Sequence, residues 1–197
     1  MGLTAGLRRH GLPCPVCTGN VCRSPAVKRL LQRTLAGHQA ITISSAGVDA
    51  LVGEPIQPPM VRLLEEQGVD AENFAAQQLT KPMANGADLI LTATRRQRAA
   101  VVELSPATVR RTFTLREFAR LAQQVAPGKL PDSAAPAGRL AALVPLATAG
   151  RQQVEAELDD IIDPYRRSDA VYQEAFAHIL DAVHAIGTVV LAERTQQ

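Results

Sequence analysis

Aromatic residues are scarce in this chain. Tryptophan is absent, and phenylalanine, tyrosine and tryptophan together make up 3% of the 197 residues. Long apolar runs are missing as well, because no stretch approaches the roughly 20 residues that a helix needs to cross a bilayer. The first sixteen residues hold charges and two prolines and lack the apolar segment of a signal peptide. We therefore expect no membrane insertion and a cytoplasmic protein.

A strong charge of one sign is also lacking. The 21 lysine and arginine residues nearly balance the 19 aspartate and glutamate residues, so the net charge is +2. Nucleic-acid binding would need a basic stripe or patch, and we expect no nucleic-acid partner. The length suits one α/β domain spanning residues 1–197, and the 46% of hydrophobic residues can supply its core.

The cysteines are few and clustered. The chain has three, Cys14, Cys17 and Cys22, and all lie within nine residues. An odd number in one short segment is not the pattern of a disulfide-stabilised secreted protein. The cluster instead indicates nucleophilic, redox or metal chemistry.

Apolar periodicity predicts strands that alternate with helices. A helix opens at Ser24-Pro25 with the serine as N-cap. Further helices are expected at 58–67, 95–104, 115–125 and 168–192, and strands before Cys17 and at 41–45, 88–92 and 109–113. This order favours an α/β fold, a single three-layer domain with a four-stranded parallel sheet and helices on both faces. Ligands of such folds bind at the carboxyl ends of the strands, where the loop after the first strand lies.

Residues 126–157 differ in composition and are rich in proline, glycine and alanine. We interpret the segment as an insertion into the domain, a long connection with a short helix at 139–143. A lid or a partner-binding loop is the alternative interpretation.

The loop from Cys17 to Ser24 is the most informative segment. Five residues separate Cys17 from Arg23, and a helix follows directly. Such a short loop at a helix N-terminus can turn its backbone N–H groups toward one anion. Gly19 supplies backbone freedom, and Asn20 tolerates left-handed geometry and can brace the loop. The guanidinium of Arg23 can donate two parallel hydrogen bonds to phosphate oxygens.

The positive electrostatic potential of these N–H groups and of the Arg23 guanidinium also acts on the thiol of Cys17. A helix N-terminus and a nearby cation can lower a cysteine pKa from about 8.5 to roughly 3.5–7.5, which gives a nucleophilic thiolate. The hydroxyl of Ser24 can then donate a hydrogen bond to that sulfur and stabilise it as a leaving group.

Three motifs resemble one known family. Residues 16–25, Val-Cys-Thr-Gly-Asn-Val-Cys-Arg-Ser-Pro, are similar to the active-site loop of low-molecular-weight protein-tyrosine phosphatases. Ser45-Ala46-Gly47 and Asp163-Pro164-Tyr165 match the same family, in the same order, and the resemblance covers roughly residues 12–125 and 159–192. It implies hydrolysis of phosphotyrosine in protein substrates through a cysteinyl-phosphate on Cys17, with no cofactor and no metal.

The resemblance also implies roles for other residues. Asp163 matches the general acid that protonates the departing phenolate, and Tyr165 and Leu51 match the pocket walls. Arg166 stands where many relatives have a second tyrosine, which favours acidic sequence around the target. The remaining loop residues are expected to bind phosphate or another oxyanion: Thr18, Gly19, Asn20, Val21, Cys22 and Ser24.

Some features leave alternatives open. Cys22 either fills the underside of the loop or traps oxidised Cys17 as a reversible disulfide. Cys14 and Cys17 form a CxxC pattern, which can mean thioredoxin-like redox chemistry or half of a metal site. With His10 and Cys22 they could bind zinc, although zinc would leave the rest of the loop unexplained. Pro13 and Pro15 cannot donate to a neighbouring strand, so we predict a short or one-sided first strand.

Two other functions share the same loop. Arsenate reduction would need a small-molecule thiol, because no cysteine follows Cys22. A non-catalytic phosphate-binding module is the second alternative.

Overall fold

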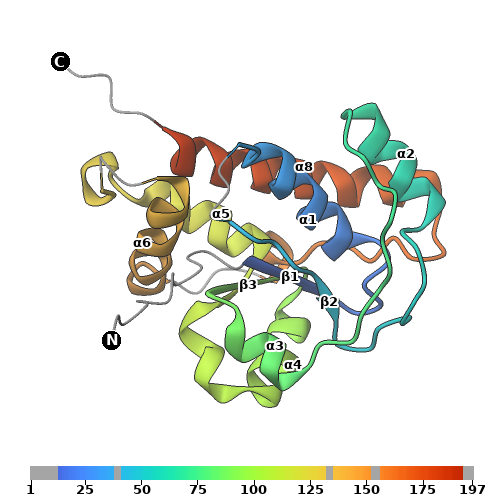
Figure 1. Ribbon diagram of the computed structural model, residues 1–197, viewed down its shortest axis with the longest axis horizontal. Coiled ribbons are helices and arrows are strands. Elements are labelled where there is room, and N and C mark those ends of the chain that lie inside the picture. Colours follow the sequence, from blue (N-terminus) through green and yellow to red (C-terminus); the bar gives the residue numbers. More distant parts are fainter. Residues whose placement is uncertain (1–12, 38–40, 132–134, 152–155, 193–197) are drawn as a thin grey trace, which may run out of the picture.

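The computed structural model describes residues 13–37, 41–131, 135–151 and 156–192. A parallel sheet lies at its centre, where Figure 1 labels β1, β2 and β3. The sheet has four strands in the order β2-β1-β3-β4. The strands are β1 (Pro13–Cys17), β2 (Ala46–Gly47), β3 (Leu89–Thr92) and β4 (Thr112–Thr114). All four are buried, as expected for a parallel sheet covered on both faces.

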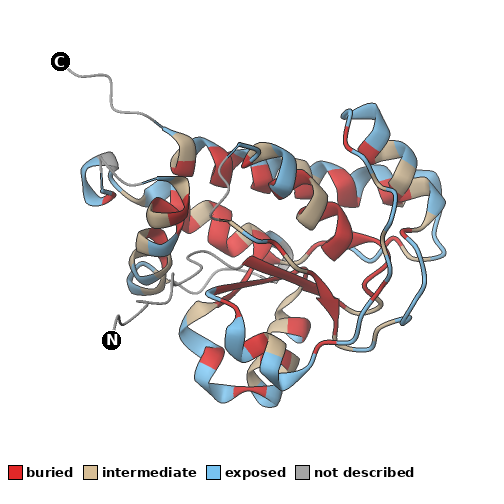
Figure 2. Ribbon diagram, viewed as in Figure 1, coloured by how far each residue is buried: buried red, intermediate tan, exposed pale blue. Residues whose placement is uncertain are grey.

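Helices cover both faces of this sheet (Figure 1). One face packs against α1 (Arg23–Thr34), α2 (Pro58–Glu66), α5 (Leu115–Gln124) and α8 (Asp169–Leu191), and the other against α3 (Lys81–Gly86) and α4 (Arg95–Leu104). Successive side chains of a strand point to opposite faces, so Leu89 and Leu91 join the first core and Ile90 the second. Figure 2 shows the buried sheet between these layers. The predicted three-layer α/β architecture is confirmed.

The two prolines make β1 one-sided, as predicted. Residues Pro13–Val16 pair with Leu89–Thr92 of β3, whereas only Val16 and Cys17 pair with β2. The oxygen of Val16 faces β3 and that of Pro13 faces the β2 side, so both missing proline donors face β2. The strand is not short, since it keeps five residues.

The same missing donors explain a wrong prediction, the strand at 41–45. The nitrogen of Ser44 donates to the oxygen of Pro13, but the prolines return no hydrogen bond. The second strand therefore begins only at Ala46, opposite Val16. The strand predicted at 109–113 is also displaced, because a 3₁₀ helix, η1 (Pro106–Arg111), precedes β4.

One helix starts at a different residue than predicted, and one short helix was not predicted. The helix α1 begins at Arg23 with Cys22 as N-cap, so Ser24 lies inside the first turn and its hydroxyl is free for another contact. The short helix α3 was missed because Pro82 and Asn85-Gly86 resemble a loop, although the side chain of Thr80 caps its N-terminus.

The segment interpreted as a long connection is largely helical. After the 3₁₀ turn η2 (Pro127–Lys129), helix α6 (Pro136–Ala149) begins with a proline and buries Leu140, Leu143 and Ala147 in the main core. Its buried Arg139 donates to the oxygens of Val189 and Val190 near the end of α8. The prediction of only a short helix at 139–143 was wrong because alanine favours helix.

The last two helices frame the segment that carries Asp163. The four-residue α7 (Ala156–Asp159) precedes it and α8 follows it. Although the sequence has no continuous apolar run of that length, α8 is, among the described residues, the one helix long and apolar enough by overall length and composition to span a membrane. Its buried face, including Ala175, Ile179 and Val183, packs against α1 and α5, as in a core helix.

Candidate active site

The loop between β1 and α1 is held from outside through its carbonyl groups. The oxygens of Cys17, Thr18 and Gly19 accept hydrogen bonds from the backbone nitrogens of residues 48, 49 and 51, at 2.9, 3.1 and 3.0 Å. In a trans peptide the N–H points opposite to the C=O. The N–H groups of residues 18, 19 and 20 therefore point away from the 48–51 segment, which leaves them available to an anion.

Asn20 braces the loop from below. It is fully buried and has a φ of +58°, in the left-handed region that asparagine tolerates. Its Nδ2 donates to Ser24 Oγ at 2.8 Å and Ser45 Oγ at 3.1 Å, and its Oδ1 accepts from the nitrogen of Gln77 at 2.9 Å. Both predicted properties of Asn20 are present.

Glycine matters at one position of this site, but not at the predicted one. Gly19 does not have a positive φ, and an added Cβ would make ordinary contacts with Val21 and Leu51 at 3.5 and 3.6 Å. The predicted need for backbone freedom at Gly19 is therefore wrong. At Gly47 a Cβ would stand 2.3 Å from the oxygen of Thr18, so only glycine allows this segment to approach the loop.

Cys17 and Ser24 face each other. Cys17 Sγ lies 3.0 Å from Ser24 Oγ, and both residues are buried. Ser24 Oγ already accepts from Asn20, so its proton is free to point at the sulfur or at the oxygen of Ala46, 3.4 Å away. A thiolate at Cys17 would receive this hydrogen bond.

A cavity of about 180 Å³ opens above the loop and brings together most of the predicted site. Ten residues line it: Cys17, Thr18, Gly19, Val21, Cys22, Arg23, Asp49, Leu51, Asp163 and Tyr165. Asn20 and Ser24 do not line it and support the loop instead. Asp49 was missed, because no local pattern marks an exposed aspartate that lies between Gly47 and Leu51.

Arg23 connects the loop with the segment that carries Asp163. Its side chain is 4% exposed, its Nη1 donates to the oxygen of Ile161 at 3.0 Å, and its Nη2 forms a 2.7 Å ion pair with Asp163 Oδ2. Its buried Nε has no hydrogen-bond partner among the described residues. A buried donor of this kind normally has a partner, and a bound oxyanion would supply one.

The carboxylate of Asp163 makes two contacts, one within its own turn and one with the phosphate loop. Its Oδ1 accepts from the nitrogen of Tyr165 at 3.2 Å, so it does cap a turn. Its Oδ2 pairs with Arg23, and its side chain is 52% exposed at the cavity mouth. A sulfur, a guanidinium and a carboxyl group thus meet at one cavity, as in an active site that transfers phosphoryl groups through a covalent intermediate.

Comparison with known proteins agrees with this arrangement. Residues 14–135 match the model of the family described as "Low molecular weight phosphotyrosine protein phosphatase". The chain belongs to this family. It is accordingly a protein-tyrosine phosphatase, a phosphoric monoester hydrolase.

Individual relatives of this phosphatase are moderately similar. It is 30% identical over 170 residues to a probable low molecular weight protein-tyrosine-phosphatase EpsP of Ralstonia solanacearum, covering 86% of this chain and 89% of that protein. It is 40% identical over 91 residues to Wzb of Salmonella typhi, covering 46% and 59%. The solved structure of Vibrio vulnificus Wzb in complex with benzylphosphonate aligns with a TM-score of 0.66 at 26% identity, covering 91% and 98%.

The other two cysteines of the phosphatase have distinct environments. Cys22 Sγ lies 3.6 Å from the hydroxyl of Tyr172, and burial raises the pKa of Cys22 to about 12, so it stays a neutral thiol. Cys14 belongs to the core cluster on the opposite face of the sheet from Cys17, and burial raises its pKa as well. The CxxC pattern therefore does not bring its two sulfurs together on one face.

The zinc alternative gains no support from the described residues. His10 lies outside them, and no group of three or more histidine, cysteine, aspartate or glutamate side chains within them could hold a metal ion.

One further supporting residue was missed from the sequence. The buried Gln97 of α4 donates from Nε2 to Thr18 Oγ1 at 3.0 Å. Its Oε1 accepts from the nitrogens of Ala93 and Thr94 at 3.0 and 3.1 Å, which fixes the amide. The contact joins residues 79 positions apart, so no sequence spacing could have indicated it.

Proposed function

We propose that this phosphatase hydrolyses phosphotyrosine in proteins through a phosphoryl group carried on Cys17. One observation carries the proposal: the cavity above the loop is lined by Cys17, Arg23 and Asp163 together. These side chains supply the nucleophile, the anion-binding group and the acid that a cysteine-dependent phosphatase needs.

In the first step the phosphate dianion lies in the loop, held by backbone N–H groups and by Arg23. The Cys17 thiolate attacks phosphorus in line with the phenolic oxygen. The S–P bond forms, the P–O bond to the tyrosine breaks, and Asp163 donates its carboxyl proton to the departing oxygen.

In the second step a water molecule attacks the phosphorus of the cysteinyl-phosphate. The Asp163 carboxylate takes a proton from that water, the S–P bond breaks, and inorganic phosphate leaves. Ser24 Oγ, 3.0 Å from Cys17 Sγ, donates its hydrogen bond to the thiolate as it departs.

The cavity walls favour an aromatic substrate. Leu51 is 37% exposed at the mouth, and the ring of Tyr165 is half-buried beside it. A phenyl ring can bury apolar surface against both while its phosphate reaches the loop. The benzylphosphonate bound by the Vibrio vulnificus relative likewise joins a phenyl ring to a phosphonate, which is an analogue of the phosphate group. Phosphotyrosine proteins of the cytoplasm are the proposed partners.

Turnover by matched variants tests this function. Wild type should hydrolyse a phosphotyrosine peptide in the presence of a chelator, whereas Cys17→Ser and Arg23→Ala should each lose at least about 10³-fold in kcat/KM. Cys14→Ala is the control, because it removes a buried thiol from the opposite face and should retain turnover. Full activity of Cys17→Ser would exclude the mechanism.

Two further measurements address the alternatives. Arsenate-dependent oxidation of a small-molecule thiol, without peptide hydrolysis, would favour the reductase. Phosphate binding without any turnover would favour a non-catalytic module.

A further inference from the structure

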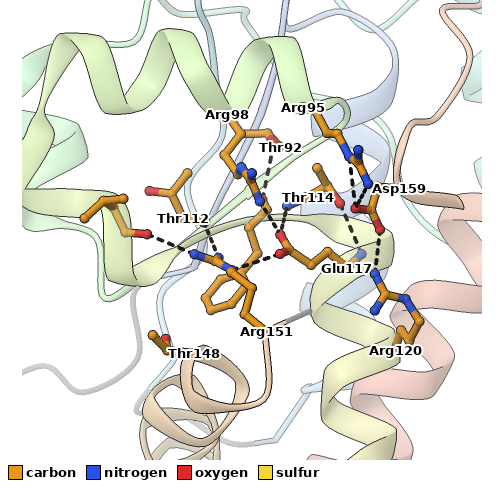
Figure 3. Close-up of polar contacts among 12 residues, drawn as sticks. Thr92, Arg95, Arg98, Thr112, Thr114, Glu117, Arg120, Thr148, Arg151 and Asp159 are labelled. Carbon is orange, nitrogen blue, oxygen red and sulfur yellow. Dashed lines mark hydrogen bonds and ion pairs between the residues drawn. The ribbon is translucent and has the colours of Figure 1, made fainter. Parts of the chain in front are cut away.

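The segment from Asp159 to Asp163, called the acid loop below, is anchored at its start by a buried carboxylate. The Asp159 side chain is 5% exposed and lies between two arginines from different helices (Figure 3). Arg95 of α4 donates to Asp159 Oδ2 from Nε at 3.1 Å and from Nη2 at 2.9 Å. Arg120 of α5 donates to Asp159 Oδ1 at 2.8 Å.

The middle of the acid loop is held by the side chain of Asp160 and by the backbone of Ile161. Asp160 Oδ1 accepts from the nitrogen of Arg95 at 2.7 Å, at the N-terminus of α4. Ile161 is buried, and its nitrogen donates to the oxygen of Ala93 at 2.9 Å, just beyond β3. Its oxygen accepts from Arg23 at 3.0 Å. These contacts tie the acid loop to the sheet, to α4 and to the phosphate loop.

Asp163 itself has weaker support. It is half-exposed, and its side chain contacts Arg23 and the nitrogen of Tyr165. A substrate phosphate would compete for the first of these contacts, because it needs the same guanidinium. The position of the acid over the leaving oxygen then depends on the anchors earlier in the loop.

We propose that Asp159, held by Arg95 and Arg120, is a positioning residue that sets where Asp163 stands during proton transfer. The inference rests on the proposed phosphatase function. Replacing Asp159 by asparagine keeps the shape but removes the charge that two arginines share. The start of the acid loop then shifts, and a misplacement of about 1 Å can cost on the order of 10²-fold in rate.

The chain supplies a matched control in Glu117. This carboxylate is 3% exposed and also lies between two arginines, with 2.9 Å contacts to Arg98 and Arg151 (Figure 3). It belongs to α5, as Arg120 does, but it holds no part of the acid loop. The Asp159 cluster is Asp159 with its two arginines, and the Glu117 cluster is Glu117 with its own two. Breaking either cluster leaves buried charges unpaired and destabilises the fold. Only the Asp159 cluster should affect proton transfer.

The experiment compares kcat/KM for two aryl phosphates in wild type, Asp159→Asn and Glu117→Gln. p-Nitrophenyl phosphate has a good leaving group that needs little protonation, and phenyl phosphate has a poor one. We expect Asp159→Asn to lower kcat/KM roughly 10-fold more for phenyl phosphate, and Glu117→Gln to affect both equally. In an Asp163→Ala background, Asp159→Asn should add no further leaving-group effect.

The experiment can refute the positioning role of Asp159 and the proposed phosphatase function separately. An unchanged ratio of the two substrates in Asp159→Asn, or a full additional effect in the Asp163→Ala background, refutes the positioning role alone. A wild-type protein that hydrolyses neither substrate refutes the proposed function. Should Asp159→Asn fail to fold, Arg120→Gln replaces it. Arg95 keeps the buried carboxylate paired so that the fold survives, but the loss of one of its two partners lets Asp159 shift, and the ratio should change in the same direction. An unchanged ratio in a folded Arg120→Gln variant refutes the role equally.

Discussion

Gly47→Ala should damage catalysis although Gly47 does not line the cavity above the loop. An added Cβ would lie 2.3 Å from the oxygen of Thr18 and 3.0 Å from the Cβ of Ala50. Ordinary contacts begin at 3.4 Å, so the loop and the 47–50 segment must separate by roughly 1 Å. That oxygen also accepts from the nitrogen of Asp49 at 3.1 Å, and the separation weakens this bond.

The expected magnitudes follow from this displacement. Overpacking at a buried position costs about 1–3 kcal/mol of unfolding free energy. A shift of about 1 Å in the anion-binding N–H groups should lower kcat/KM on the order of 10²-fold. The affinity for inorganic phosphate should weaken as well, because the same N–H groups bind substrate and product.

The assay combines chemical denaturation, aryl phosphate turnover and competitive inhibition by phosphate. Gly86→Ala is the control, since a Cβ there meets nothing within 4 Å and the residue ends α3. Wild-type kcat/KM and phosphate inhibition in Gly47→Ala would refute the claim that the 47–51 segment shapes the loop.

Three further predictions follow from the site. Ser24→Ala should slow breakdown of the cysteinyl-phosphate about 10-fold, so rapid-mixing experiments should show a larger burst of phenol relative to steady-state turnover. Asn20→Ala removes three hydrogen bonds, two of them buried, and puts alanine at a φ of +58°, and should lower the unfolding free energy by about 3–5 kcal/mol in urea. Because the folded-state pKa of Cys22 is raised from 9.0 to about 12, the folded state holds that proton longer, so stability should fall by up to about 1.4 kcal/mol per pH unit above pH 9. Cys22→Ala should remove this part of the slope, and equal slopes would contradict the assignment.

The sequence predicted the local parts of the site well. Cys17, Arg23 and Asp163 line one cavity as expected, because the loop and the turn at Asp163 each have a short, specific pattern. The supporting contacts were not predictable, since Gln97 reaches Thr18 across 79 positions and Asp159 meets arginines 64 and 39 positions away. Spacing along the chain carries no information about such pairs.

The fold shows the same division between local and distant effects. Helix 95–104 was predicted to the residue, and its start is fixed locally by a capping box at Thr94. The strand at 41–45 failed because its pairing depended on donors that Pro13 and Pro15 lack. Helix α6 extends beyond the predicted 139–143 because alanine favours helix, Pro136 fits the first turn, and Pro145 does not end the helix.

The prolines of β1 bear on how this enzyme tolerates sequence change. Only two residues of β1 pair with β2. The catalytic loop nevertheless keeps its shape, because backbone nitrogens of the 48–51 segment donate hydrogen bonds to its carbonyl oxygens. The strand and the loop are therefore separately supported parts. Mutations that weaken β1 should lower the melting temperature with little effect on phosphate affinity. Mutations in residues 48–51 should lower phosphate affinity with a smaller effect on the melting temperature.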